Sequence, residues 1–525
     1  MDQHHSSKQG NPPPAVARRL EGDSLLRKGK IDESIAKYNE AIALDDSDST
    51  VYVQRSHALL RAGRFLGAYY DGLKAIQLDD SSSNYKGFVR LAASCDALDL
   101  LPLSVEFWQK AIQRLPQDAH RKMELYQKIL ARVAALEQIP HLVSSNLKFL
   151  PASTPLDDTP WGIVRSIIPA LEAAGNTQSS AWPLYNAWTD VNTANGIMKH
   201  IVDNPPADIE DSARVVVFLT DAILRESRAF IYFHSQYATK IEHLCADLAR
   251  NCPLLATPGD MLRVSDKIMA VGGWQALSPI LDIAIRCEFL VGYISFYVRG
   301  MRRFALEHFQ HAIDLIVAGR RRWPDVPNEE RGFVFDIAFL VGVRCLFAEL
   351  LAKRHLSSED DEEIYPLTRL KSEMDQLVRE LGIWHENQRS AAPRETQDDG
   401  YEKSMFNRFS AMFLWASAGY YIAMKKTTPE ATNYLSLASQ YLLKAADKFP
   451  EDDELHAMCL ADSIVLSIAD KPIKELLPIM QRLRESKEKM EKIWLPSEAT
   501  VHRDMQLRKL LEGGRIFCSS RVKDL

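Results

Sequence analysis

The feature that most constrains this chain is a sequence repeat near its N-terminus with a period of 34 residues. Gly29 and Gly63 are separated by this period, and further pairs keep it: Gly22 and Ser56, Leu25 and Leu59, Ala41 and Ala75, and Asp46 and Asp80. A third copy follows two residues late, with Ala92, Ala111 and Pro116 in the matching places. Repeats of this length are supersecondary units that bury their apolar faces only when several copies stack.

The residue types at the repeated positions predict a pair of helices in each copy. Small residues stand where two helix backbones must cross closely, and large apolar residues such as Leu25 and Tyr38 fill the gaps. Gly29 and Gly63 stand where the first helix of a pair must end, a place that favours glycine. Residues 118–138 are expected to add a capping helix. Its apolar stripe consists of Met123, Tyr126, Ile129, Leu130, Val133 and Leu136.

Two segments resemble a known family more closely. The stretches YVQRSHALLRAGRFLGAYYDGLKAIQLDD (residues 52–80) and KGFVRLAA (residues 86–93) resemble the tetratricopeptide repeats of chaperone-binding adaptors such as the heat-shock organising protein. The resemblance implies that residues 15–138 form a three-repeat superhelix with a concave groove. In that family, a carboxylate clamp in the groove binds the C-terminal Glu-Glu-Val-Asp tail of cytosolic heat-shock chaperones.

The clamp of that family has a basic residue and an asparagine in repeat one, an asparagine in repeat two, and a lysine and an arginine four residues apart in repeat three. The resemblance places Arg19 and Asp23, then Gln54, then Lys86 and Arg90 at these positions. The basic residues match, but both asparagines are replaced. Because Asp23 lies one helical turn after Arg19, we expect the two to pair. Lys86 and Arg90 then remain as the main anchor for an acidic peptide, with solvated surface charge as the open alternative.

Length and composition bound the class of protein. A chain of 525 residues is too long for one core, and 46% hydrophobic and 26% charged residues are ordinary for globular domains. The net charge of −6 argues against a nucleic-acid or anionic-membrane partner. The longest apolar runs, residues 289–298 and 332–343, are too short to span a bilayer. Seven scattered cysteines without a CxxC pair indicate reduced thiols, so we expect a cytoplasmic location, with the nucleus as the alternative.

Outside the repeats, the chain divides into segments that differ in composition and in helical pattern. Residues 1–14 are polar and proline-rich, and they are expected to be disordered. Residues 139–211 hold many prolines and are expected to form a connector of short helices and ordered loops. Residues 212–525 are expected to be a second helical domain, with a flexible insertion at 357–400 around a short amphipathic piece.

The second helical domain is expected to contain degenerate repeats. Gly300, Ala305, Phe309 and Ala312 keep the mutual spacings of the glycine, small, aromatic and small positions in the N-terminal copies. No sustained alternation of apolar and polar residues predicts a strand. The expected fold class is therefore all-α: an N-terminal three-repeat superhelix followed by a larger α-solenoid region.

No motif predicts catalysis, a cofactor or a metal site. Phosphate loops, dinucleotide-binding glycines and metalloprotease signatures are not found. The letters GDSL at residues 22–25 match a lipase motif, but Gly22 is a packing position of the first repeat. His308 and His311 share a helix face, whereas a metal site needs three or four convergent ligands. A basic cluster could receive an acidic segment or form a solvated helix end. It comprises Arg299, Arg302, Arg303, Arg320, Arg321 and Arg322.

Two hypotheses on function follow. The first is a non-catalytic scaffold or adaptor that binds a partner peptide or helix in the repeat groove, co-chaperone-like through an incomplete clamp, with no nucleic-acid or membrane partner. The second is an enzyme or regulatory subunit whose active site lies in residues 140–525, with the repeats as a docking arm. A convergent pocket of buried His, Asp and Glu would favour the second.

Overall fold

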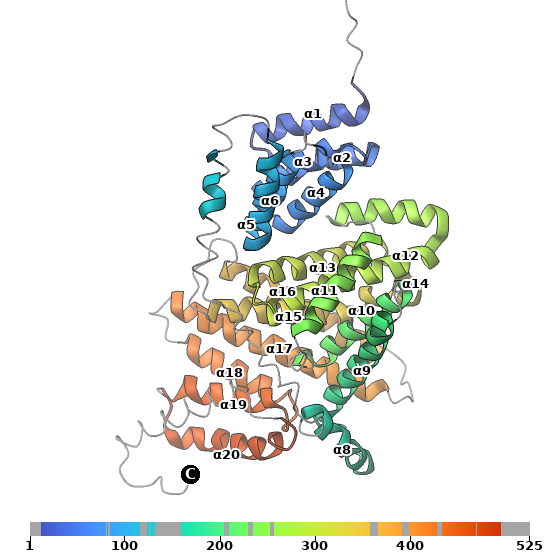
Figure 1. Cartoon of the computed structure of the whole chain (residues 1–525). Helices are drawn as coiled ribbons and strands as arrows, with labels where there is room; N and C mark the ends of the chain where they lie inside the picture. Colours follow the sequence, from blue (N-terminus) through green and yellow to red (C-terminus); the bar gives the residue numbers. More distant parts are fainter. Residues whose placement is uncertain are drawn as a thin grey trace, which may run out of the picture. The chain divides into compact units, whose positions relative to one another are not determined.

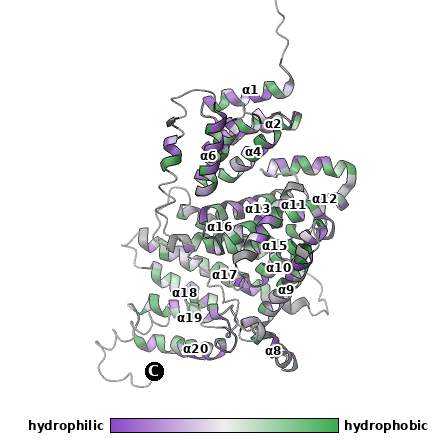
Figure 2. Cartoon of the chain, in the orientation of Figure 1, coloured by the Kyte–Doolittle hydropathy of each residue, from purple (hydrophilic) through white to green (hydrophobic). Residues whose placement is uncertain are grey.

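The computed structural model describes residues 12–79, 81, 85–115, 123–124, 126–131, 159–203, 209–228, 235–251, 257–356, 366–390, 398–427, 433–468 and 470–494. Every regular element in these ranges is a helix, and none is a strand (Figure 1). The expected all-α fold class is confirmed. The chain forms two compact units: residues 1–147 with 241–332, and residues 148–240 with 333–525. The helices alternate hydrophobic and hydrophilic stretches, as amphipathic helices do (Figure 2).

The first unit begins with three helix pairs, as the repeat predicts. They are α1 (Pro14–Arg27) with α2 (Ile31–Leu44), α3 (Ser49–Arg61) with α4 (Phe65–Leu78), and α5 (Tyr85–Ala97) with α6 (Leu101–Arg114). The small residues at the crossings are fully buried: Ser34, Ala41, Ala68, Ala75, Ala92 and Ala111. At Gly22 the approach is closest, because a Cβ there would lie 2.6 Å from the ring of Tyr38. These positions therefore set the distance between paired helices.

The turns inside the first two pairs require glycine. Gly29 and Gly63 have φ angles of 78° and 72°, in the left-handed region where a side chain is strained. The third pair has no glycine at this place, and Asp99 takes the same conformation with φ 58°. Aspartate is among the few residues that tolerate it. The third copy is thus a repeat whose turn has diverged.

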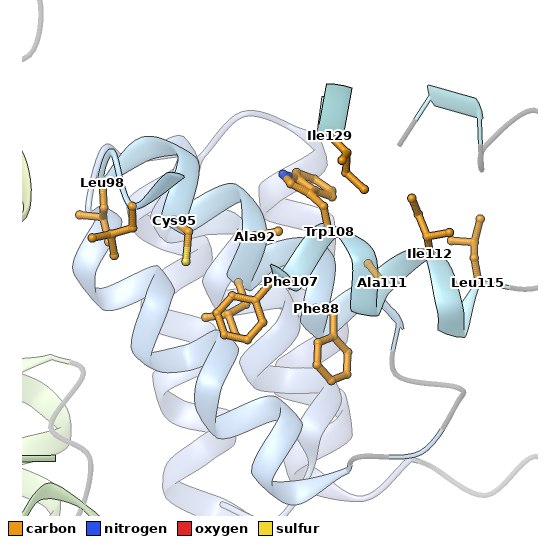
Figure 3. Packing of buried hydrophobic residues seen from close by; sticks show 12 residues of the cluster. Phe88, Ala92, Cys95, Leu98, Phe107, Trp108, Ala111, Ile112, Leu115 and Ile129 are labelled. Atoms are coloured by element: carbon orange, nitrogen blue, oxygen red, sulfur yellow. The ribbon is translucent and has the colours of Figure 1, made fainter. Parts of the chain in front are cut away.

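The third pair encloses a core of its own, in which Trp108, Phe88 and Phe107 are buried (Figure 3). Ile129, from the segment expected to cap the repeats, belongs to this core. The rest of the expected apolar stripe does not pack as predicted, since Met123, Tyr126 and Leu130 are exposed. Val133 and Leu136 lie outside the described residues. In the described part of this segment, the cap is one isoleucine rather than a full face.

A second element of the first unit packs against the repeats, and it comes from much later in the chain. Helices α12 (Pro258–Tyr297) and α13 (Arg302–Arg322) form a long hairpin that contacts α2 and α4. Gly300 turns the chain with φ 68°, and Ala305, Phe309 and Ala312 are fully buried. These residues lie as their counterparts in the N-terminal pairs do. Gly292 approaches Phe309 so closely that a Cβ would be 3.0 Å away, as at Gly22 and Tyr38.

Helix α12 is bent at Gly273, where φ is 60° and ψ is −159°. By length and composition, α12 is the one helix of the described residues that could cross a membrane. After α13, the chain is interrupted at Gly332, whose φ is 106°. It forms the short α14 (Asn328–Arg331), a 3-10 turn η4 (Phe333–Phe335) and α15 (Ile337–Leu356).

The second unit is a helical array whose elements come from both sides of α12 and α13. Its helices are α8 (Pro160–Ala173), α9 (Ala181–Asp203), α10 (Ile209–Arg225), α15, α16 (Leu367–Ser390), α17 (Asp398–Thr427), α18 (Tyr434–Ala446), α19 (Glu454–Ser467) and α20 (Ile473–Met490). Helix α11 (Ser235–Asn251) runs across the division between the units. At Gly342 on α15, a Cβ would meet Leu224 of α10 at 2.8 Å and Phe409 of α17 at 2.9 Å. These three helices therefore cross at a glycine.

Two expectations for this unit need correction. The proline-rich connector contains the 23-residue helix α9, which pairs with α10, so it is not made of short helices throughout. The expected insertion contains the 24-residue helix α16, which packs against α15 and α17 and buries Leu370, Leu377 and Trp384. Arg344 of α15 makes ion pairs with Glu373 and Glu380 of α16. Residues 367–390 are thus part of the core, while 357–365 and 391–397 lie outside the described residues.

Candidate peptide-binding groove and the buried contacts behind it

The five residues predicted from the clamp resemblance lie on the first helices of the three repeats. Arg19 and Asp23 are on α1, Gln54 is on α3, and Lys86 and Arg90 are on α5. Helix α3 contacts both α1 and α5. The five side chains therefore belong to one helical layer, formed by α1, α3 and α5, which we call the groove layer.

In repeat one, the charges of the groove layer are satisfied within the protein. Arg19 lies 3.6 Å from Asp23 and 3.5 Å from Asp48, which also caps the N-terminus of α3. Asp23 accepts a 2.8 Å hydrogen bond from the hydroxyl of Tyr38. Burial, and then this carboxylate, raise the pKa of Tyr38 well above its ordinary value. The expected pairing of Arg19 with Asp23 is confirmed, and Asp23 also holds the aromatic ring that packs on Gly22.

In repeat three, the positive charge is not neutralised by a neighbour in the described residues. Arg90 is partly buried, and its Nε is enclosed without a hydrogen-bond partner there. Burial lowers the pKa of Arg90 from its ordinary value, although a guanidinium stays charged in proteins. Lys86, one turn earlier, is exposed. Arg90 and Lys86 thus give α5 two positive charges, and the charge of Arg90 acts on His57 of α3.

His57 of α3 is a groove residue that the sequence reasoning missed. Burial, and then the positive charges of Arg90 and Arg61, lower the pKa of His57 to about 4. The imidazole is therefore neutral at pH 7, and it lies within the electrostatic reach of Arg90. Its position three residues after Gln54 places both side chains on one face of α3, a signal that the sequence does contain.

Behind the groove layer, a buried arginine joins the repeats to α12. Arg55 is 1% exposed, and all five of its N–H donors are used. Nε and Nη2 donate to Asp71 at 2.8 and 2.7 Å, and Nη1 donates to Asn39 at 2.8 Å. Nη1 and Nη2 also donate to Asp260, at 3.1 and 3.0 Å. Asp260 lies in the first turn of α12, where Thr257 caps the helix and donates to the same carboxylate at 2.8 Å.

The two carboxylates around Arg55 differ in their pKa. Burial raises the pKa of Asp71 more than the attraction of Arg55 lowers it, and the net pKa is about 6. Burial acts in the same sense on Asp260, but Arg55, Thr257 and Arg263 outweigh it and lower the pKa of Asp260. One cation therefore holds two buried carboxylates, and Asp260 is the one that remains firmly ionised.

A second buried cluster joins repeat two to the α12–α13 hairpin. The carboxylate of Glu288 on α12 accepts a hydrogen bond from the hydroxyl of Tyr70 on α4. It also lies 2.7 Å from Nδ1 of His308 and 3.2 Å from Nδ1 of His311, both on α13. Burial raises the pKa of Glu288, but the two histidines outweigh burial and hold it well below its usual range. His308 and His311 thus meet at a carboxylate.

The other candidates for chemistry are mostly accounted for by packing. Within the described residues, no group of three or more His, Cys, Asp or Glu could hold a metal ion. In the basic cluster, Arg299 pairs with Glu242 at 2.7 Å, Arg303 with Asp99 at 3.6 Å and Arg322 with Asp266 at 3.4 Å. These arginines have partners in their own unit, so an acidic segment from elsewhere is not needed to balance them.

Buried charges in the second unit also pair with one another. Glu226 is fully buried and pairs with Arg228 at 2.8 Å and with Arg408 at 2.9 Å. Arg228 reaches Asp453 at 2.9 Å and lies 3.7 Å over the ring of Trp494. Asp453 also caps the N-terminus of α19. Glu226, Arg228, Arg408 and Asp453 thus form a buried ion-pair network within the second unit.

Comparisons with known proteins agree with the repeat assignment. No family model matches the chain. Over 109 residues it is 34% identical to a DnaJ homolog subfamily C member 7 homolog of Schizosaccharomyces pombe, covering 20% of this chain and 22% of that protein. Over 194 residues it is 26% identical to a small glutamine-rich tetratricopeptide repeat-containing protein of Dictyostelium discoideum, covering 36% and 54%. The chain thus spans about a fifth and about half of the length of these relatives.

Among solved structures, yeast Tom70 aligns over 96% of this chain and 97% of its own, with 12% identity and a TM-score of 0.26. That score is too low to carry an argument.

Proposed function

We propose that this tetratricopeptide-repeat protein is an interaction scaffold whose groove layer binds an acidic peptide with a free C-terminal carboxylate. The proposal rests on Arg90, because its guanidinium is partly exposed and no carboxylate of the described residues acts on it. A carboxylate ligand would give this partly desolvated cation the partner that it lacks. Charge-assisted bonds to a carboxylate are the strong kind.

The anchor that we propose covers repeats two and three. Lys86 and Arg90 are one turn apart on α5, and Gln54 and His57 lie on the neighbouring helix α3. Gln54 can donate an amide hydrogen bond, from a longer arm than the asparagine of the related clamp. Arg19 contributes little, since Asp23 and Asp48 already hold it. We therefore expect binding of the Glu-Glu-Val-Asp type of tail that is weaker than in a complete clamp, or selective for a different acidic sequence.

The whole chain is the appropriate sample for the test, because α12 and α13 complete the first unit. A labelled Glu-Glu-Val-Asp peptide is titrated against wild type, Lys86→Ala and Arg90→Ala. Each substitution should weaken binding about tenfold or more, the loss expected for one charge-assisted bond. Lys30→Ala is the matched control, since Lys30 is an exposed lysine at the start of α2 whose partner is Glu33. Equal affinity of all four proteins would refute the anchor.

Asp23 provides a second arm of the same test. In the family that the repeats resemble, an asparagine stands in its place. Asp23 is instead a negative charge in the layer that we propose binds a negatively charged peptide. Asp23→Asn keeps the acceptor for the Tyr38 hydroxyl and frees Arg19 from one of its two carboxylates. We expect it to tighten peptide binding by a few fold. A weakening would mean that Arg19 and Asp23 act only in packing.

The location of the protein is part of the proposal. The described cysteines, Cys95, Cys245, Cys287, Cys345 and Cys459, are buried free thiols. Buried reduced thiols support a reducing compartment. We therefore propose that the scaffold is cytoplasmic, with the nucleus as the alternative. Fluorescence microscopy of the tagged chain distinguishes the two, and a secretory-pathway signal would contradict both.

A further inference from the structure

At its bend, α12 forms an apolar corner whose exposed side chains take no part in the groove layer. Residues 268–281 carry no charged side chain. At Gly273 the helix changes direction through a left-handed backbone conformation, and Val271 beside it is 93% exposed. Ile268, Met269 and Trp274 are partly exposed on the same stretch. A valine with almost its full surface in water is unusual on a folded unit, and contiguous exposed apolar residues mark interaction sites.

A basic stretch lies beside this corner. The ring of Trp274 packs edge-on against Trp323, with ring centroids 5.2 Å apart. Trp323 directly follows Arg320–Arg322, the last turn of α13. Arg321 is exposed, whereas Arg322 and Lys267 pair with Asp266 and Asp46. Asp325, Glu329 and Glu330 follow soon after, so the rim is mixed in charge rather than uniformly positive.

Helix α12 is long and apolar enough to cross a membrane, but charged side chains tie its second half to the first unit. Only 22% of its most apolar 18-residue window is buried, less than a core helix would show. Beyond the bend, however, Arg286 is buried and pairs with Asp282 at 2.8 Å, and Glu288 is held by Tyr70 and the two histidines. Charges satisfied by the protein tie this half of α12 to its own unit. What remains for an outside partner is the corner itself.

We propose that the α12 corner, with Val271 at its tip, docks on the surface of a lipid bilayer. The corner projects rather than forming a groove, and an acyl-chain surface deforms around a projecting valine, whereas a protein partner would need a matching pocket. Tryptophan next to such a tip suits the interface, since its ring is apolar and its N–H is polar. Basic side chains set back from the apolar tip are the arrangement of proteins that lie on a membrane.

This proposal differs from the expectation of no membrane partner. That expectation rested on the negative net charge and on apolar runs that are too short to span a bilayer. An interfacial corner needs neither, because its affinity comes from a few inserted apolar side chains. The mixed rim implies that apolar insertion supplies most of the affinity and that anionic lipid adds a smaller part.

The test is flotation of the full chain with phosphatidylcholine vesicles, and with vesicles that also contain phosphatidylserine. We expect wild type to float with both and Val271→Asp to lower the partition coefficient about tenfold or more, the scale for losing one inserted valine. Val378→Asp is the matched control, since Val378 is 54% exposed on α16, and it should float like wild type. Val271→Trp should partition more strongly than wild type.

Three results would overturn the proposal. They are no flotation of wild type with either vesicle, equal partition of Val271→Asp and Val378→Asp, and no gain from Val271→Trp. Thermal unfolding of each variant is recorded alongside, and the exposure of Val271 predicts an unchanged midpoint. Because Val271→Trp reports a gain, a folding defect in Val271→Asp does not remove the test. Peptide binding to the groove layer is not involved, so the outcome is independent of the proposed function.

Discussion

Arg55 and Asp260 are 205 residues apart in the sequence and share two hydrogen bonds, at 3.1 and 3.0 Å, in the interior of the first unit. Asp71 takes two further donors of the same guanidinium. The repeats and the α12–α13 hairpin are therefore joined by a buried ion triad, not by apolar contact alone. Such triads are sensitive to which member is removed, since the cost depends on the charge that is left behind.

The triad predicts an order of stabilities. Arg55→Met leaves the buried Asp71 without a cation and Asp260 with only the more distant Arg263, at 3.6 Å, and should lower the free energy of unfolding by about 3–5 kcal/mol. Asp260→Ala leaves Arg55 paired with Asp71 but strips two donor contacts, and it should cost about 1–3 kcal/mol. Asp266→Ala, at an exposed aspartate on the same helix, should be close to neutral. Urea unfolding gives the three values, and Asp260→Ala costing more than Arg55→Met would contradict this account of the triad.

Close helix crossing predicts that a single methyl group is harmful at one glycine and harmless at another. Gly22→Ala places a Cβ 2.6 Å from the Tyr38 ring and should destabilise the first unit by about 1–3 kcal/mol. Gly196→Ala on α9 meets nothing within 4 Å and should be neutral or slightly stabilising, because alanine favours a helix by about 1 kcal/mol over glycine. Thermal melts followed by circular dichroism compare the two. Equal midpoints would show that Tyr38 can move aside.

His57 predicts a pH dependence with a definite sign. Its pKa falls from 6.5 in the unfolded chain to about 4 in the folded one. Between these values the unfolded chain binds the proton and the folded chain does not, so stability is lost as the pH falls from 6.5 toward 4. Because His57 is only half-buried, we expect its share to be about 1 kcal/mol. His57→Gln should reduce the loss between pH 7 and 4.5, whereas His243→Gln, at an exposed histidine, should not.

The Tyr70 hydroxyl allows a test of how much the second buried cluster contributes to the free energy of unfolding. Tyr70→Phe removes the hydroxyl that donates to Glu288 and keeps the ring. The remaining carboxylate contacts are the two histidines, so the free energy of unfolding should fall by about 1–3 kcal/mol, the cost of one lost bond to a buried charge. Tyr126→Phe, at an exposed tyrosine, should change nothing measurable. A Tyr70→Phe protein as stable as wild type would mean that the histidines alone satisfy Glu288.

The repeats were predictable because their signal is local. Small residues at a 34-residue period report the closest approach of two helices, and Gly22 against Tyr38 shows the contact that the period encodes. The spacing of Gly300, Ala305, Phe309 and Ala312 carried the same information to α13. The partner of these surfaces was not predictable, because no pattern links Asp260 to Arg55 across the intervening chain.

At helix α16 the prediction from the sequence was wrong, for a different reason. Leu370, Leu377 and Trp384 are seven residues apart and are all buried, which is the spacing of one continuous helix face. The acidic residues before it and the polar segment after it drew the interpretation toward a flexible insertion. In the groove, the pairing of Arg19 with Asp23 was predictable from their one-turn spacing. The lowered pKa of His57 was not, because it depends on burial and on Arg90 from another helix.

The sequence separation of Arg55 from Asp260 also means that the two residues are synthesised at different times. A ribosome adds about 5–20 residues per second, so Arg55 is made roughly 10–40 seconds before Asp260, which lies 205 residues later. During that interval a nascent chain carries Arg55, Asp71 and Tyr70 without the hairpin that later covers them. The first unit can be completed only after residues of the second have been made. Its assembly therefore depends on long-range closure, and a translational pause between residues 140 and 260 would prolong the period in which these side chains are open to other partners.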